Sequence, residues 1–218
     1  MIKYPYEHND DIISVRPVLV VGGCISCFVS VIFCILLVLL PPGPISPDTG
    51  ALRFISDGMD SHCGWSAVIL GTCSLFILIC QLVAAAHMAK HLAALWAVIQ
   101  TIGWNIVLGA VDTGWTLHYI GLALFLLGGQ IFHFMAGYDP SYGSLMYTRV
   151  NILASFFALL FGILGMISML DQGGNATLRS FAVAFEFIFM FFSVAQNMCI
   201  VIALDMYKDI HIRFESYP

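Results

Sequence analysis

The chain has little charge for its length. Only 10% of its 218 residues are charged, whereas a soluble globular domain has about 25%. Hydrophobic residues make up 60%, and the mean hydropathy is +0.94. This composition excludes an ordinary water-soluble domain, because so much apolar surface needs lipid as its solvent. The net charge of −5 also excludes an overall basic surface for nucleic acid. We therefore expect membrane lipids, and no nucleic acid, around this protein.

The usual signatures of soluble enzymes are missing too. The sequence has no glycine-rich phosphate loop, no H-E-x-x-H zinc pattern and no G-x-S-x-G elbow. The tripeptide Asp-Thr-Gly of pepsin-like proteases occurs twice, beginning at Asp48 and at Asp112. Both copies fall in loops and suit turns, because Asp can bond its own downstream backbone and Gly accepts a positive φ. The sequence favours a non-enzymatic protein.

Disulfide chemistry is not expected. Of the seven cysteines only Cys63 falls near an outer loop, so no pair is available in an oxidising compartment. Cys24 and Cys27 have the C-x-x-C spacing of redox sites, but they lie in an apolar stretch. We interpret them as small packing residues.

What the chain has in abundance is long hydrophobic runs. A helix needs roughly 20 apolar residues to cross the hydrocarbon core of a bilayer. Six runs reach this length, at 18–40, 65–86, 92–111, 117–137, 150–170 and 181–204. The residues before the first run are acidic and polar, unlike a cleaved secretory signal, so we expect this run to be retained. The sequence predicts an all-α polytopic membrane protein: a six-transmembrane-helix bundle over 18–204, with terminal segments 1–17 and 205–218.

The basic residues predict the orientation. An even number of spans puts both termini on one side, and cytoplasmic loops are enriched in Lys and Arg. Only Arg53 and Arg179 fall on the side away from the termini. The other six basic residues share the terminal side: Lys3, Arg16, Lys90, Arg149, Lys208 and Arg213. Both termini are therefore predicted to be cytoplasmic. Asn175 begins an N-A-T glycosylation pattern that falls on the predicted outer side.

Polar residues inside the predicted spans are candidates for function, because burying them in lipid is costly. Glu186 falls in the sixth span and Asn105 in the third, both in the predicted outer third. A hydrogen bond between them would lower the burial cost. Glu186 then serves as a structural lock, as part of a lipid-headgroup or proton site, or as a group that reaches the interface. Four glutamines, in the inner half of four spans, either join helices or line a polar cleft: Gln81, Gln100, Gln130 and Gln196.

The histidines suggest a different class of function. Two histidines at equal depth on neighbouring helices can ligate a haem axially. Two histidines lie near the outer ends of spans and three near the inner side, respectively His62 and His118, and His87, His91 and His133. A haem b electron-transfer subunit is therefore the alternative to a protein without cofactors.

Small and aromatic residues predict how the bundle packs. The stretches "GILG" and "LGGQ" offer small residues for close helix contact. Four aromatic residues fall where an interfacial belt is expected: Trp65, Trp115, Tyr119 and Tyr147.

Three short motifs resemble a known family. "ISPDTG" stands in the first outer loop, "NIVLGAVDTGWTLHYIGLALFLLGG" crosses the third turn, and "AFEFIFMFF" stands in the last span. The chain resembles the DRAM/Sfk family of six-span proteins, which includes damage-regulated autophagy modulators. The matching positions are Ile45, Ser46, Asp48, Thr49 and Gly50, then His118 and Gly121, and lastly Glu186. Pro47 and the following "ALRF" depart from the family pattern.

The resemblance implies a role rather than a reaction. The family is linked to autophagy and lysosomal membranes, to plasma-membrane lipid organisation and to remodelling of GPI anchors, with no agreed catalytic mechanism. We expect a non-enzymatic integral membrane protein of the endomembrane, lysosomal or plasma membrane that organises lipids or a partner complex. The candidate polar site comprises Glu186, Asn105, His118, Asp48 and Asp112. A structural accessory subunit of a larger membrane complex is a further alternative.

Overall fold

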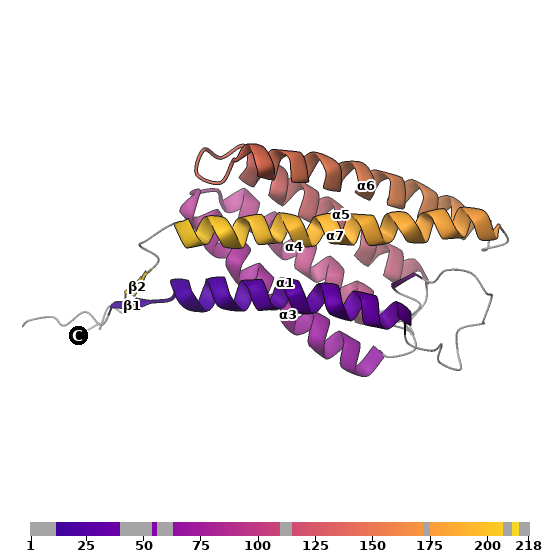
Figure 1. Ribbon diagram of the computed structural model, residues 1–218, viewed down its shortest axis with the longest axis horizontal. Coiled ribbons are helices and arrows are strands. Elements are labelled where there is room, and N and C mark those ends of the chain that lie inside the picture. Colours follow the sequence, from indigo (N-terminus) through magenta and orange to yellow (C-terminus); the bar gives the residue numbers. More distant parts are fainter. Residues whose placement is uncertain are drawn as a thin grey trace, which may run out of the picture.

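Six long helices form the protein in the computed structural model (Figure 1). The structure describes residues 12–39, 54–55, 63–109, 115–171, 175–206 and 211–213. The helices are α1 (Arg16–Leu39), α3 (Cys63–His87), α4 (His91–Gly109), α5 (Trp115–Gly137), α6 (Leu145–Leu170) and α7 (Ala176–Met206). Each contains a stretch long and apolar enough to cross a membrane. The predicted six-helix bundle is confirmed.

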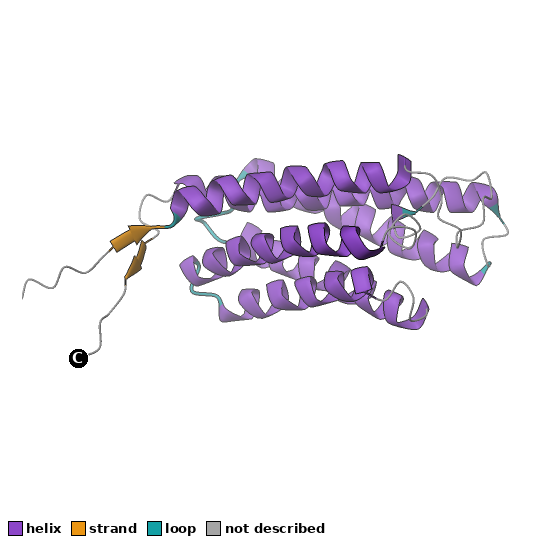
Figure 2. Ribbon diagram, turned by 90° about the horizontal axis from the view of Figure 1, so that it is seen from below, coloured by secondary structure: helices purple, strands orange, loops and turns teal. Residues whose placement is uncertain are grey.

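The helices run side by side along the long axis of the molecule (Figures 1 and 2). Each contacts the next along the chain, and α7 returns to contact α1, so the six form a closed ring. Helix α7 also contacts α3 across the ring. The last helix therefore touches helices from both halves of the chain.

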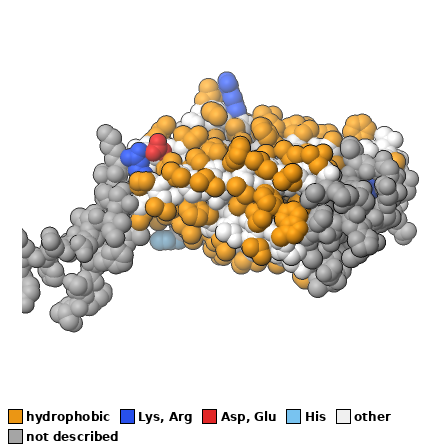
Figure 3. Space-filling view, turned by 60° about the horizontal axis from the view of Figure 1, so that its bottom comes forward, with side chains coloured by type: hydrophobic (Ala, Val, Ile, Leu, Met, Phe, Trp, Pro, Cys, Tyr) orange, Lys and Arg blue, Asp and Glu red, His pale blue; other side chains and the backbone are white. Residues whose placement is uncertain are grey.

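The outer surface of the bundle is apolar. Hydrophobic side chains cover most of the face shown in Figure 3 between the two ends. Phe28 of α1, Leu127 of α5 and Leu159 of α6 are each at least 60% exposed. Water would penalise so many exposed large apolar side chains, whereas lipid does not. The surface agrees with an integral membrane protein.

Glycines bring α4 and α5 into close contact. A Cβ at Gly103 would lie 2.6 Å from the carbonyl oxygen of Gly121, and one at Gly128 would lie 2.6 Å from the Gln100 nitrogen. Gly128 belongs to "LGGQ", so this part of the packing prediction is confirmed. "GILG" does not pack in this way, because a Cβ at Gly162 would meet no atom within 4 Å among the described residues.

Capping side chains explain where α6 and α7 begin. Ser144 accepts the Tyr147 N–H at 3.1 Å, and Asn175 accepts the Leu178 N–H at 3.0 Å. Serine and asparagine are preferred caps, because their oxygens satisfy amides that the first turn leaves free. Both helices therefore start about five residues before the predicted spans, and Glu186 lies about ten residues, or roughly 15 Å, into α7.

Ion pairs and a short ribbon hold the end of the bundle that carries the termini. Arg16 at the start of α1 pairs with Asp205 near the end of α7 at 2.7 Å. Lys90, between α3 and α4, pairs with Asp139, after α5, at 3.1 Å. Strands β1 (Ile12–Ser14) and β2 (His211–Arg213) pair antiparallel beyond the helices. The two terminal segments therefore lie at one end, and the assignment of that end to the cytoplasm stays a prediction.

Candidate functional site

The carboxylate of Glu186 holds the segment between α1 and α3. Glu186 is 8% exposed, and its Oε2 accepts the backbone N–H of Ile55 at 2.9 Å. Ile55 is 2% exposed, and the guanidinium of Arg179 lies 5.4 Å from the ring of neighbouring Phe54. Helix α7 thus holds two consecutive residues of that segment. This geometry favours the interpretation of Glu186 as a structural lock.

The predicted hydrogen bond between Asn105 and Glu186 is wrong. The amide nitrogen of Asn105 donates to the Thr101 carbonyl oxygen at 2.8 Å and to the Ser74 hydroxyl at 3.3 Å. A primary amide has only two N–H groups. Both are used within α4 and toward α3, so none is left for the carboxylate.

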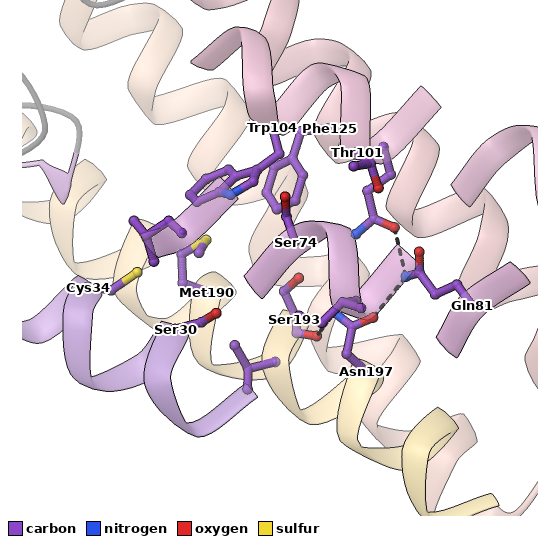
Figure 4. Close-up of a pocket in the computed structure, with 14 residues that line it drawn as sticks. Ser30, Cys34, Ser74, Gln81, Thr101, Trp104, Phe125, Met190, Ser193 and Asn197 are labelled. Atoms are coloured by element: carbon purple, nitrogen blue, oxygen red, sulfur yellow. Dashed lines mark hydrogen bonds between the residues drawn. The ribbon is translucent and has the colours of Figure 1, made fainter. Parts of the chain in front are cut away.

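Deeper in the bundle, three amide side chains meet between α3, α4 and α7. We call Gln81, Gln100 and Asn197 the Gln81 cluster. Gln81 Nε2 donates to Gln100 Oε1 at 3.0 Å and to Asn197 Oδ1 at 2.8 Å (Figure 4). Asn197 in turn donates to the Ser193 carbonyl oxygen at 3.0 Å. Gln81 is 1% exposed, and its Oε1 has no hydrogen-bond partner among the described residues.

A second group of polar side chains joins α5, α6 and α7. We call Gln130, Asn151, Ser155 and Gln196 the Gln196 cluster. Gln196 Nε2 lies 3.1 Å from Asn151 Oδ1 and 3.5 Å from Gln130 Oε1, which also accepts from Ser155 at 2.8 Å. All four predicted glutamines therefore form interhelical hydrogen bonds, which confirms their role in joining helices.

His133 lies next to the Gln196 cluster. It is 1% exposed, and its Nδ1 lies 2.7 Å from the hydroxyl of Tyr147. Its carbonyl oxygen accepts from Asn151 at 2.9 Å, and the Asn197 side chain lies close to its ring. Asn197 thus stands between the two clusters. Tyr147 is also 1% exposed, so its predicted place in an interfacial aromatic belt is wrong.

A cavity of about 50 Å³ lies at the centre of the bundle, lined from α1, α3, α4, α5 and α7 (Figure 4). One part of its lining is apolar, from Leu70, Ile77, Trp104, Phe125, Met190 and Val194. The Gln81 cluster forms the polar part, with serines and a threonine beside it. None of the described lining side chains is charged. Gln81 and Gln100 therefore both join helices and line a polar cavity, so the two predicted alternatives hold together.

The remaining predicted site residues do not meet at one place in the described part of the chain. His118 is half-buried, with its ring 5.8 Å from that of Tyr119. Asp48, Asp112 and His62 lie outside the described residues. Asn175 is exposed, and its side chain caps α7.

The histidines proposed as haem ligands differ in their surroundings. His87 and His91 are exposed on either side of the turn after α3, whereas His133 is buried. Among the described residues, no group of three His, Cys, Asp or Glu side chains is placed to hold a metal ion. The six cysteines that the structure describes are free thiols. Haem ligation stays a prediction.

Sequence reasoning did not single out Asn151, Ser193 or Asn197. A signal was available in α7, where Ser193, Gln196 and Asn197 precede Ile200 and Leu204 at helical spacing. All five are buried, because residues three and four apart share one face of a helix. Asn151 stood one residue inside a predicted span that in fact begins earlier.

The fold and the site together define the class of protein: an integral membrane protein built as a six-helix bundle, with a polar interior around a small cavity. Comparison with known proteins found no family model, no curated protein and no solved structure that matches the chain. The resemblance to the DRAM/Sfk family stays a prediction.

Proposed function

We propose that this protein is a non-enzymatic membrane protein that binds and organises lipids, with the central cavity as its binding site. The observation that carries the proposal is a cavity inside a transmembrane bundle with both an apolar lining and an amide cluster. Ligand sites are typically mostly apolar, with a few placed polar groups. An amphiphile drawn from the surrounding bilayer suits that lining, and the DRAM/Sfk resemblance points to lipids as well.

The polar groups of the site suit binding better than catalysis. Ser30, Ser74 and Ser193 line the cavity, but no histidine or carboxylate is among its described lining residues. A serine nucleophile needs an adjacent base. The buried carboxylate of Glu186 binds the backbone at Ile55, where it has a structural role.

A tryptophan scan of α3 tests the proposal. Ile77 lines the cavity, whereas Leu75 on the same helix is 53% exposed on the outer surface. We expect Ile77→Trp to fill the cavity and to lower the number of lipids retained in native mass spectrometry. Leu75→Trp adds the same side chain facing outward and should retain lipid as the wild type does. Equal retention by both variants, or no retained lipid in the wild type, would contradict the proposal.

The resemblance also implies a residence in the endomembrane system, the lysosome or the plasma membrane, and a role in autophagy. Fluorescence microscopy of the tagged full chain against markers of these membranes tests the residence. Staining confined to another membrane, such as the mitochondrial one, would contradict it.

A further inference from the structure

We infer that the cavity takes an uncharged lipid bearing a hydroxyl or amide N–H group, which donates a hydrogen bond to Gln81 Oε1. This inference rests on the proposed function and adds the chemical class of the ligand. It depends on two observations, the absence of charge in the described lining and the single unused acceptor of the Gln81 cluster.

The lining selects against a charged ligand. All its described polar groups are amides, hydroxyls or a thiol. A charged group moved from water or the headgroup region into this cavity would lose solvation and meet no opposite charge there. The described Arg16, Lys90 and Arg179 lie in α1 and α7 near their ends or in the turn after α3, and none of them lines the cavity. Phosphate and carboxylate headgroups are therefore disfavoured.

The hydrogen bonds of the Gln81 cluster then define which polar group fits. Gln81 uses both N–H groups, on Gln100 Oε1 and Asn197 Oδ1, so those two oxygens already accept a bond. Gln81 Oε1 is buried without a partner among the described residues. A buried acceptor left unsatisfied is destabilising, so the site gains from a ligand that donates. An ester or ether, which only accepts, leaves Gln81 Oε1 unsatisfied.

The size of the cavity limits what enters it. A water molecule needs about 10–15 Å³ by this kind of measure, so about 50 Å³ holds a small polar group and the atoms next to it. A whole headgroup with sugars or phosphates is too large. The apolar side chains beside the cluster, such as Trp104 and Phe125, would contact the hydrocarbon that follows the donor. Water is the competing occupant.

The test uses the full chain in phosphatidylcholine nanodiscs doped with one of three probes: dioleoylglycerol, its acetate ester, or dioleoylphosphatidic acid. Acetylation removes the only O–H donor, and phosphatidic acid adds charge. We expect native mass spectrometry to show dioleoylglycerol retained about three- to tenfold more than either other probe, the range of one hydrogen bond. Gln81→Met should reduce dioleoylglycerol to the level of the acetate. Gln130→Met removes an amide of the Gln196 cluster, away from the cavity, and should not.

The outcomes separate this inference from the proposed function. Equal retention of dioleoylglycerol and its acetate would overturn the donor requirement and leave lipid binding intact. Preferred retention of phosphatidic acid would overturn the selection against charge. Retention of no probe and no cellular lipid would overturn the proposed function as well. If Gln81→Met does not fold, the comparison of the three probes on the wild type still decides the question.

Discussion

Gln81 of α3 and Asn197 of α7 are 116 positions apart in the chain and share a hydrogen bond of 2.8 Å inside the bundle. Gln196, the neighbour of Asn197, donates to the other side, toward α5 and α6. Two consecutive residues of α7 thus bind two different pairs of helices. Hydrogen bonds between helices are worth about 1 kcal/mol each in lipid, so several are needed to fix the arrangement. Helix α7 is the element that connects both halves of the bundle.

Removing the Glu186 carboxylate should release the segment after α1. Glu186→Ala leaves the buried Ile55 N–H without its acceptor, which costs about 1–3 kcal/mol. We expect a lower free energy of unfolding in detergent and faster hydrogen exchange at the Ile55 amide. Glu186→Gln keeps an acceptor oxygen and should lose less. Unchanged exchange at Ile55 in the alanine variant would argue against the lock.

Tyr147 should stabilise the protein through its hydroxyl. Tyr147→Phe removes only that oxygen and leaves His133 Nδ1 without its partner, at a cost of about 1–3 kcal/mol. Tyr138→Phe is the matched control, because Tyr138 is 75% exposed. Chemical denaturation in a mild detergent measures both. Equal stabilities for the two variants would mean that the buried hydrogen bond contributes nothing measurable.

Glycines in α4 and α6 should respond in opposite ways to alanine. Gly103→Ala places a Cβ against the backbone of α5, and overpacking of this kind costs about 1–3 kcal/mol or more. Gly162→Ala meets open space among the described residues and should raise helix stability by up to about 1 kcal/mol. Thermal unfolding monitored by circular dichroism compares them. A Gly103→Ala variant as stable as the wild type would contradict the close contact of α4 and α5.

Asp139 should make stability depend on pH at the acidic end. Burial raises the pKa of its carboxyl group, but the hydrogen bond from the Ser141 N–H and the nearby Lys90 ammonium outweigh burial, so the pKa lies below its ordinary value. A lowered pKa in the folded state stabilises above the unfolded value of about 3.9, and this contribution is lost as the pH falls through the folded value.

The matching variant is Asp139→Asn. We expect it to be less stable than the wild type at pH 7 by up to about 1 kcal/mol, since ion pairs at the surface are weak. The difference should shrink as the pH falls below about 3.9. Unfolding curves over this pH range measure it. A difference that grows on acidification would show that the sign of the pKa shift is wrong.

Both chain ends should be accessible from one side of the membrane. Strands β1 and β2 pair beyond the bundle, and the Lys and Arg distribution predicts that this side is the cytoplasm. Epitope tags at the two ends should therefore both react after selective permeabilisation of the plasma membrane. Reaction of one tag alone would contradict the shared side, and reaction of both in intact cells would contradict the cytoplasmic assignment.

Much of the fold could be predicted because each hydrophobic run carries its own signal. The six spans follow from run length alone, and four glutamines could be recognised as joining helices because amides in lipid need partners. The starts of α6 and α7 were placed too late, because Ser144 and Asn175 extend the helices past the apolar runs. Tyr147 was assigned to the interface for the same reason.

The partners of the polar groups were decided only by the tertiary structure. Nothing local to Asn105 shows that its amide turns toward Ser74 rather than Glu186, or that the acceptor of Gln81 is left unused beside a cavity. The sequence by itself determined that six helices lie in lipid, because the free energy of transfer into lipid is a property of each side chain and adds along a run. Which side chains meet depends on the rotation and spacing of neighbouring helices, and these are set by contacts such as Gly103 against Gly121, far from the residues they align.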